Sequence, residues 1–242
     1  MIFSSIEKRV QFCLAIVLIA NIALWFVLRG EQSVWSNVPP APSLNMAIMS
    51  GLGDAGFVYR VNGLQLQNLG DTGGRVTSLD EYNYEELGRW FFLQDNLDNR
   101  SNFTPYLAAY YFSAVQDPQL LGPVIDYLSH VGTVLNGNKW RWLAQAVYLA
   151  RFRMKDFDKA FSLAETLAGM DIENAPGWVQ QMPAFVKNQT GDKAAAYALM
   201  LQILKSSGEE LHPTEVYSMR VFMCTRLLDE ESAVKNPLCE GL

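Results

Sequence analysis

The chain has 242 residues, of which 50% are hydrophobic and 18% are charged, and its formal net charge is −6. An acidic chain without a basic stripe excludes nucleic acid as a partner, because contacts with phosphates supply most of the affinity of such complexes. Ten Tyr, thirteen Phe and six Trp exclude a largely disordered chain.

An uncharged apolar run near the N-terminus predicts a transmembrane helix. Residues 10–28 contain no charged residue, and at about 1.5 Å per residue a helix of this length measures roughly 28 Å, close to the hydrocarbon thickness of a bilayer. A cleaved signal peptide is the alternative interpretation. We prefer an uncleaved anchor, because the run exceeds the usual apolar region of about 7–15 residues and the segment from Leu28 to Glu31 lacks a small-residue cleavage site.

The charges around this run predict its orientation. Lys8 and Arg9 precede it, whereas Arg29 is balanced by Glu31. The positive-inside rule therefore places the N-terminus in the cytoplasm. We expect a single-pass protein of the inner (cytoplasmic) membrane that contacts the lipid bilayer through residues 10–28 and carries a periplasmic domain.

Two polar residues lie within the apolar run. Gln11 is near one end and can reach water, whereas Asn21 lies well inside the run. An intramembrane amide can hydrogen-bond to a neighbouring helix, so Asn21 is the candidate for a helix–helix contact in the membrane.

A proline-rich linker, residues 30–43, follows the cytoplasmic tip and transmembrane helix at residues 1–29. Its three prolines, at positions 39, 40 and 42, favour an extended spacer. From residue 44 onward the apolar residues recur at helical spacing and nowhere alternate over a sustained run. We therefore expect an all-α protein.

Local signals predict several helix boundaries in the remainder of the chain. The segment Ser78 to Glu81 has the capping-box pattern. Residues 51–56 match the glycine spacing of a dinucleotide-binding loop, but a proline-rich segment precedes them instead of a buried strand, so we interpret them as a turn between helices. Three further helix starts are predicted at a proline: Thr104-Pro105, Asp117-Pro118 and His212-Pro213.

Several residues recur at an interval of 36 residues, which is typical of stacked helix pairs. A fainter copy lies 39 residues upstream, with Phe103 in the place of Trp142. The recurring pairs are Trp142 and Trp178, Asp156 and Asp192, Ala160 and Ala196, Leu163 and Leu199, and Leu167 and Ile203.

In this part the sequence resembles the tetratricopeptide family. It departs from the family pattern at Tyr148, where a small residue is usual, and at Pro183, which lies inside a first helix. The resemblance implies an α-solenoid of antiparallel helix pairs. Its expected parts are an N-terminal helical cap at residues 44–101, the repeats at 102–208, and a C-terminal capping helix and tail at 209–242.

The resemblance also implies a protein-binding groove lined by the first helix of each pair. Tyr and Trp are favoured interface anchors, although aromatic residues can equally belong to the core. For Trp142 and Trp178 both interpretations stay open, whereas Tyr106 and Tyr110 favour the groove. The residues that the resemblance assigns to the groove are Tyr106, Tyr110, Trp142, Gln145, Phe152, Trp178, Gln181 and Phe185.

Residues suited to chemistry are sparse. His130 and His212 are the two histidines, and neither belongs to a metal-ligand spacing, so we expect no enzyme and no bound metal or cofactor. Cys224 and Cys239 could pair in an oxidising compartment. Two separate thiols are the preferred interpretation, because sequence does not establish the geometry that a disulfide needs.

These features together predict a membrane-anchored scaffold that binds other proteins. It would serve as an accessory or assembly factor and present an extracytoplasmic helical-repeat domain to subunits of membrane complexes. The alternative is a permanent structural subunit of a large membrane protein complex.

Overall fold

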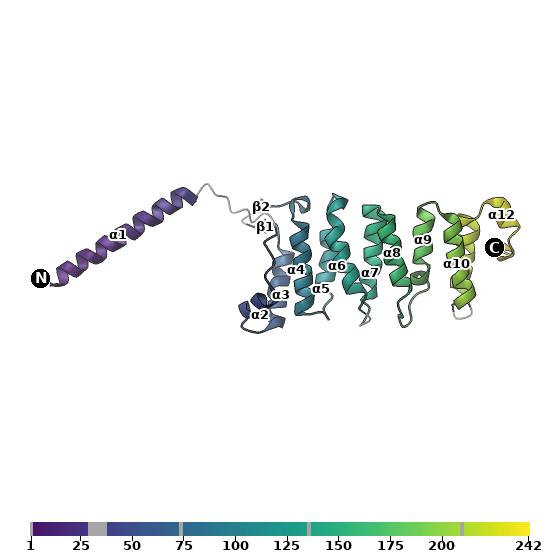
Figure 1. Ribbon diagram of the computed structural model, residues 1–242, viewed down its shortest axis with the longest axis horizontal. Helices are drawn as coiled ribbons and strands as arrows, with labels where there is room; N and C mark the ends of the chain where they lie inside the picture. The colour runs from purple at the N-terminus through teal and green to yellow at the C-terminus, as the bar shows by residue number, and fades with distance from the viewer. Residues whose placement is uncertain (1, 29–37, 73–74, 135–136, 209–210) are drawn as a thin grey trace.

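The computed structural model describes residues 2–28, 38–72, 75–134, 137–208 and 211–242. These residues are mainly helical, which confirms the expected all-α class. Figure 1 shows α1 at one end, followed by a row of helices that ends at α12. The α-helices are α1 (Ile2–Leu28), α2 (Leu44–Ser50), α3 (Ala55–Gln67), α4 (Tyr84–Leu97), α5 (Phe103–Tyr106), α6 (Gly122–Gly132), α7 (Trp140–Tyr148), α8 (Phe157–Ala168), α9 (Trp178–Gln189), α10 (Lys193–Ser207), α11 (Pro213–Phe222) and α12 (Glu230–Val234).

Shorter elements extend or join these helices. The π-helical segments continue α5, α7 and α11 and are η2 (Leu107–Tyr111), η5 (Leu149–Met154) and η6 (Met223–Leu227). The 3₁₀ turns are η1 (Leu79–Glu81), η3 (Phe112–Ala114), η4 (Pro118–Leu121) and η7 (Pro237–Cys239). Two strands of two residues each, β1 (Asp71–Thr72) and β2 (Arg75–Val76), pair antiparallel.

Helix α1 carries the apolar run. Among the described residues, one helix is long and apolar enough to cross a membrane, over Arg9–Val27, and none of that window is buried in the protein. The Asn21 amide donates a hydrogen bond to the Val17 carbonyl at 3.2 Å. The expected helix is therefore present, and its amide has a partner within the same helix.

The described end of the proline-rich linker packs on the helical domain. Residues 30–37 of this segment lie outside the described residues. Val38 is buried, the Pro39 carbonyl accepts a hydrogen bond from Trp90 Nε1 at 2.7 Å, and the Ala41 amide donates to Glu86 Oε2 at 3.3 Å. Residues 38–41, which the sequence assigns to the linker, thus contact the helical domain through α4.

Two of the predicted helix starts are wrong. Ser78 makes no capping hydrogen bond, and α4 instead begins after Asn83, whose side chain accepts from the Glu86 amide at 3.1 Å. The neighbouring Asp80 accepts from the amides of residues 116 and 117, so a tertiary contact engages this turn. Thr104 is buried within α5, and its hydroxyl lies 3.3 Å from the Tyr59 hydroxyl.

The other helix starts are confirmed. Asp117 accepts from the Gln119 amide at 2.9 Å and opens η4. His212 Nδ1 accepts from the Thr214 amide at 3.3 Å and opens α11. The glycine-rich residues 51–56 form the expected turn between α2 and α3. Asp54 caps α3, because its side chain accepts a hydrogen bond from the Phe57 amide at 2.9 Å.

Two turns that lie 36 residues apart share one local geometry. Lys155 and Gly191 both have positive φ, 57° and 84°. Each precedes an aspartate, Asp156 or Asp192, whose carboxylate accepts from the third following amide at 3.0 and 3.1 Å. Helices α8 and α10 begin directly after these aspartates.

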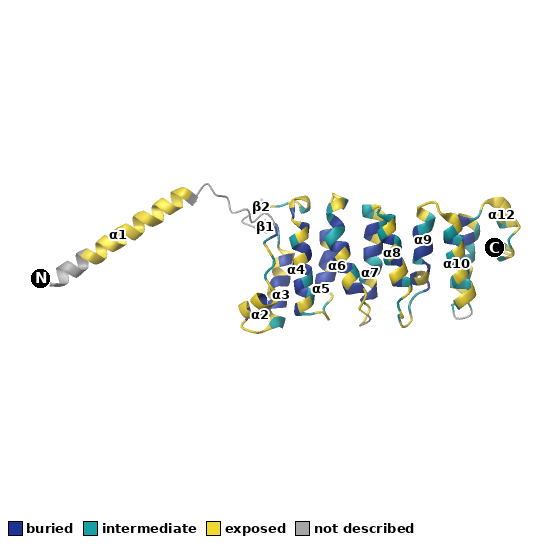
Figure 2. Ribbon diagram, viewed as in Figure 1, coloured by how far each residue is buried: buried dark blue, intermediate teal, exposed yellow. Residues whose placement is uncertain are grey.

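The core is built between neighbouring helices. Figure 2 shows buried residues throughout the row from α3 to α10, whereas α1 is exposed along its described length. Phe91 lies at the centre of the main core, with ring centroids 5.4 Å from Phe112 and 5.1 Å from Tyr127. A second, methionine-rich core joins α9, α10, α11 and η6 through Ala184, Ala196, Met200, Met219, Met223 and Leu227.

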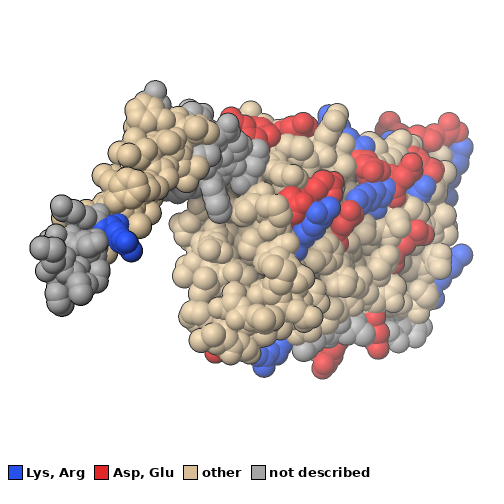
Figure 3. Space-filling model, turned by 60° about the vertical axis from the view of Figure 1, so that its left-hand side comes forward, with Lys and Arg blue, Asp and Glu red and all other residues tan. Residues whose placement is uncertain are grey.

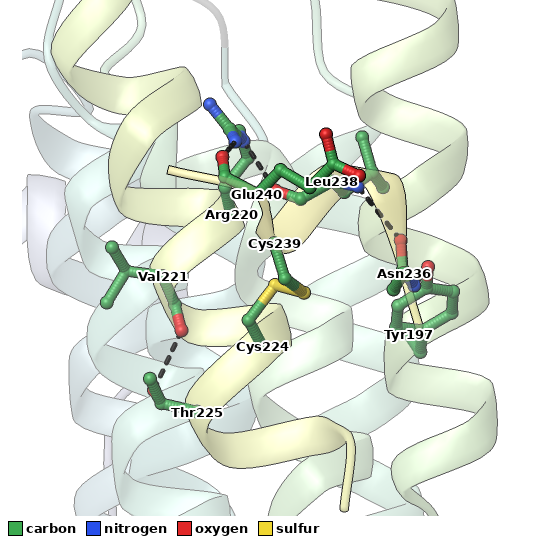
Figure 4. Close-up of a disulfide and its surroundings, with 9 residues drawn as sticks. All are labelled: Tyr197, Arg220, Val221, Cys224, Thr225, Asn236, Leu238, Cys239 and Glu240. Carbon is green, nitrogen blue, oxygen red and sulfur yellow. Dashed lines mark hydrogen bonds between the residues drawn. A yellow bond between two sulfur atoms is a disulfide. The ribbon is translucent and has the colours of Figure 1, made fainter. Parts of the chain in front are cut away.

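A disulfide closes the C-terminal end. Cys224 on η6 is bonded to Cys239 on η7, with the two Cα atoms 5.8 Å apart (Figure 4). The interpretation of these cysteines as two separate thiols is therefore wrong. Arg220 on α11 supplies the reason, because its guanidinium donates to the carbonyls of Leu238 and Glu240 at 2.7 and 2.8 Å and holds the tail against η6.

Candidate protein-binding surface

The surface between α5–η2 and α7 contains a depression with a volume of about 410 Å³. We name it the aromatic hollow. Three of its residues are aromatic and three carry amide or guanidinium groups, so its lining can make both apolar and hydrogen-bonding contacts. The lining residues are Asn102, Tyr106, Tyr110, Asn138, Arg141 and Trp142.

Helix geometry places the three aromatic rings of the hollow together. Tyr106 and Tyr110 are four residues apart and share one face of α5–η2, with ring centroids separated by 5.0 Å. The ring of Trp142 lies 6.3 Å from that of Tyr110, and its Nε1 donates to Asn102 Oδ1 at 2.8 Å. The indole is therefore held in position from the neighbouring helix.

The exposure of these rings shows that the tyrosines are not core residues. Tyr106 is 56% exposed and Tyr110 is 55% exposed, whereas Leu107 and Ala108 between them are buried. A ring that is half accessible still presents a large apolar area to a partner, and its hydroxyl remains free to reach water. Trp142 is half-buried and packs against the main core.

A second hollow, of about 400 Å³, adjoins the first. Arg141 lines both depressions. Within the second hollow, the rings of Trp140 and Trp178 lie 5.7 Å apart, and the Arg141 guanidinium lies 5.4 Å from the Trp140 centroid. Its lining residues are Trp140, Arg141, Ala144, Gln145, Pro176, Trp178 and Met182.

Of the predicted groove residues, five line these two hollows and three do not. Phe152 lies further along α7–η5, where it is exposed and its ring lies 5.1 Å from that of Tyr148 and 4.6 Å from the Arg151 guanidinium. Gln181 is buried. Phe185 is partly buried in the second core, 5.2 Å from the Phe222 ring. The residues brought together are Tyr106, Tyr110, Trp142, Gln145 and Trp178.

The position of α9 explains why Gln181 and Phe185 are not on this surface. Helix α9 packs against α8 on one side and α10 on the other, so most of its residues face a neighbour. Trp178 at its first turn is 38% exposed, whereas Val179 and Val186 are buried. A groove spacing carried over from a family pattern cannot show how far each helix is covered by its neighbours.

Sequence reasoning missed three polar residues of the aromatic hollow. Asn102 precedes Tyr106 by four residues, and Asn138 precedes Trp142 by the same interval. Residues four apart on a helix share a face, so extending the predicted groove by one turn toward the N-terminus of each helix would have found both asparagines. Arg141 precedes Gln145 by four residues and follows from the same rule.

The linings of the two hollows carry positive charge. Arg141 is the one charged residue among the described residues that line them. An Arg guanidinium beside aromatic rings suits a carboxylate, which it can bind through two parallel hydrogen bonds. No group of three or more His, Cys, Asp or Glu suited to holding a metal ion was found within the described ranges.

Comparison with protein-family models, with curated proteins and with solved structures found no match. What this surface binds is therefore inferred from its own chemistry.

Proposed function

We propose that the protein is a membrane-anchored scaffold that binds a partner protein through the aromatic hollow. The observation that carries the proposal is the contact of three rings, in which Tyr106 and Tyr110 are exposed and Trp142 is held in position by its hydrogen bond to Asn102. Fixed aromatic rings give a large contact area at a small cost in side-chain entropy, which is why Tyr and Trp are enriched in interfaces.

The arrangement of the helices supports a repeat architecture for the scaffold. Consecutive helices from α6 to α10 pack against one another, and two of the turns that join them share one geometry at an interval of 36 residues. We interpret this part as a tetratricopeptide-like α-solenoid of antiparallel helix pairs. The family resemblance implies that the first helix of each pair lines an extended binding surface, and both hollows are lined by residues of α7, which the resemblance assigns as such a first helix.

The disulfide supports an extracytoplasmic location of the helical domain. Disulfides persist in oxidising compartments and are rare in the cytosol, and the Cys224–Cys239 bond lies in the domain that follows the anchor. The positive charges before the apolar run favour the same topology, with a cytoplasmic N-terminus. We infer an inner-membrane protein with a periplasmic domain.

The chemistry of the two hollows defines the partner. The aromatic rings suit an apolar or aromatic side chain, and Arg141 suits a carboxylate, either of an acidic residue or of a chain terminus. The amides of Asn102 and Asn138 can hydrogen-bond to a peptide backbone. Amides do not exchange protons as catalytic acids and bases do. We therefore assign these groups the role of holding and orienting a ligand.

Site-specific photo-crosslinking in living cells tests the proposal. A photoreactive phenylalanine analogue replaces Tyr106, and as a control it replaces Tyr217, which lies on α11 and is 53% exposed, much as Tyr106 is. We expect a discrete protein adduct from position 106 that is absent at position 217. Equal adducts at both positions, or none at 106, would contradict a binding role for the aromatic hollow.

Purification in mild detergent distinguishes the scaffold from the alternative of a permanent subunit. A scaffold that acts transiently yields partners in substoichiometric and variable amounts. A permanent subunit of a large membrane complex yields a constant set of membrane proteins at fixed stoichiometry, and this outcome would replace the accessory or assembly role.

A further inference from the structure

The N-terminal end of the helical row exposes an apolar surface built by α2 and α3. Leu52 in the turn between these helices is 98% exposed and has a positive φ of 54°, so its side chain extends into solvent. We name the surface the N-terminal apolar face. Its exposed residues are Met46, Met49, Leu52, Phe57, Val61 and Leu64.

Helical spacing makes this surface continuous. Phe57, Val61 and Leu64 follow one another at intervals of four and three residues along α3 and share one side of it. The opposite side of α3 carries Val58 and Leu66, which are buried in the main core. Helix α3 is therefore apolar on both sides, whereas a surface helix of a water-soluble domain is ordinarily polar on its outer side.

Charged residues are scarce at this end. The segment 44–67 contains two of them, Asp54 and Arg60, whose charges cancel. Figure 3 shows a broad tan face without Lys, Arg, Asp or Glu where this end of the row comes forward, and most of the charged side chains lie above it and to its right. The C-terminal end is different, because residues 229–235 contain four charged residues. The terminal units of helical stacks are expected to have a polar outer face, and only the C-terminal end meets this expectation.

The chain itself brings the N-terminal end close to the anchor. Ten residue steps separate Leu28, the last residue of α1, from Val38, the first buried residue of the domain. A fully extended chain of ten residues spans at most about 35 Å. Helix α2 begins six residues after Val38, so the length of the chain allows the apolar face to reach the surface of a bilayer that α1 crosses.

We propose that the N-terminal apolar face inserts into the interfacial region of the lipid bilayer and forms a second membrane contact beside α1. This inference rests on the proposed role of α1 as a membrane anchor. Apolar side chains are stabilised when they leave water for the acyl boundary of the bilayer. The segment 44–67 has no net charge, so it adds no electrostatic repulsion at an anionic membrane surface. The row of helices would then project away from the membrane, with both hollows accessible.

Depth-dependent fluorescence quenching in full-length protein tests this contact. In a Cys13→Ala background, an environment-sensitive fluorophore is attached at Leu52→Cys, or at Val234→Cys as a control. Val234 lies on α12 at the opposite end and is 82% exposed, so neither substitution disturbs the core. Each protein is reconstituted into phosphatidylcholine vesicles with and without lipids that carry a nitroxide near the headgroup.

Quenching at position 52 that is severalfold stronger than at position 234 supports the proposal. Serine substitutions at Met49 and Phe57 should then reduce the quenching at position 52, because both side chains are exposed and contribute to insertion. Equal weak quenching at both positions, in protein that resists alkaline carbonate extraction, would overturn the membrane contact while leaving the anchor in place. The contact would also be overturned if position 52 were shielded from the nitroxide by a second copy, as crosslinking between two chains would reveal.

Extraction by alkaline carbonate separates the two proposals. Protein released by this treatment has no membrane anchor, which would refute both the anchor and the contact that rests on it.

Discussion

Loss of the Cys224–Cys239 disulfide should destabilise the C-terminal end of the helical row, and the length of the loop that the bond closes determines by how much. The bond closes a loop with a sequence separation of 15 residues. Cross-linking a loop of this size lowers the entropy of the unfolded chain by an amount equivalent to about 3 kcal/mol at 25 °C. The same end also contains the second core and the contacts of Arg220 with the tail, so the double variant should still fold.

The assay is urea denaturation of full-length protein in detergent, followed by circular dichroism. Replacing both cysteines by serine, or reducing the wild-type protein, should lower the free energy of unfolding by about 3 kcal/mol for the unit that contains α10, α11 and η6. Cys13→Ser is the matched control, because Cys13 is a free thiol and its loss breaks no bond. Equal denaturation curves for wild type and the double variant would refute this reasoning, as would insensitivity of the wild type to reductant.

The remaining predictions concern the aromatic hollow and the core. Replacing Tyr106 and Tyr110 by alanine should abolish capture of the crosslinked partner but leave helical content unchanged. The control Tyr217→Ala should change neither capture nor helical content, and unfolding of the double variant would assign the rings to the core. Arg153→Met removes two hydrogen bonds to backbone carbonyls at 3.0 and 2.5 Å and should lower the free energy of unfolding by about 2 kcal/mol, and an unchanged urea midpoint would contradict this. Burial raises the pKa of Tyr82 from 10.0 to about 12; the folded state therefore keeps a proton that the unfolded state loses, and stability should fall as pH rises from 10 to 12. Tyr82→Phe should make this pH dependence shallower, and an equal slope would show that other groups cause it.

The two proposed surfaces lie on different parts of the helical row and differ in their chemistry. The end of the row nearest the anchor is apolar and nearly uncharged, whereas the hollows lie on later helices and combine aromatic rings with one guanidinium. One surface suits lipid and the other suits a protein with a carboxylate. This division agrees with the proposed role of a tether that holds a partner protein near a membrane.

Features that depend on neighbours in the chain could be predicted from the sequence. The long apolar helix follows from an uncharged run, and the starts of α8 and α10 follow from aspartates that cap amides three residues away. The turn at residues 51–56 was likewise predictable, since glycine and a capping aspartate act locally. Helical class and these boundaries arise from short-range sterics and hydrogen bonds, which the local sequence contains.

Burial and pairing were decided by tertiary structure. Ser78 has a capping pattern, but the turn beside it is held by Asp80 through contacts with residues 116 and 117. Gln181 fits a groove spacing, yet α9 is enclosed between two helices and buries it. The sequence alone therefore determined an all-helical chain with one apolar anchor-like helix and several of its helix starts. Only the tertiary structure decided which aromatic rings reach the surface, because exposure depends on neighbouring helices that are distant in the sequence.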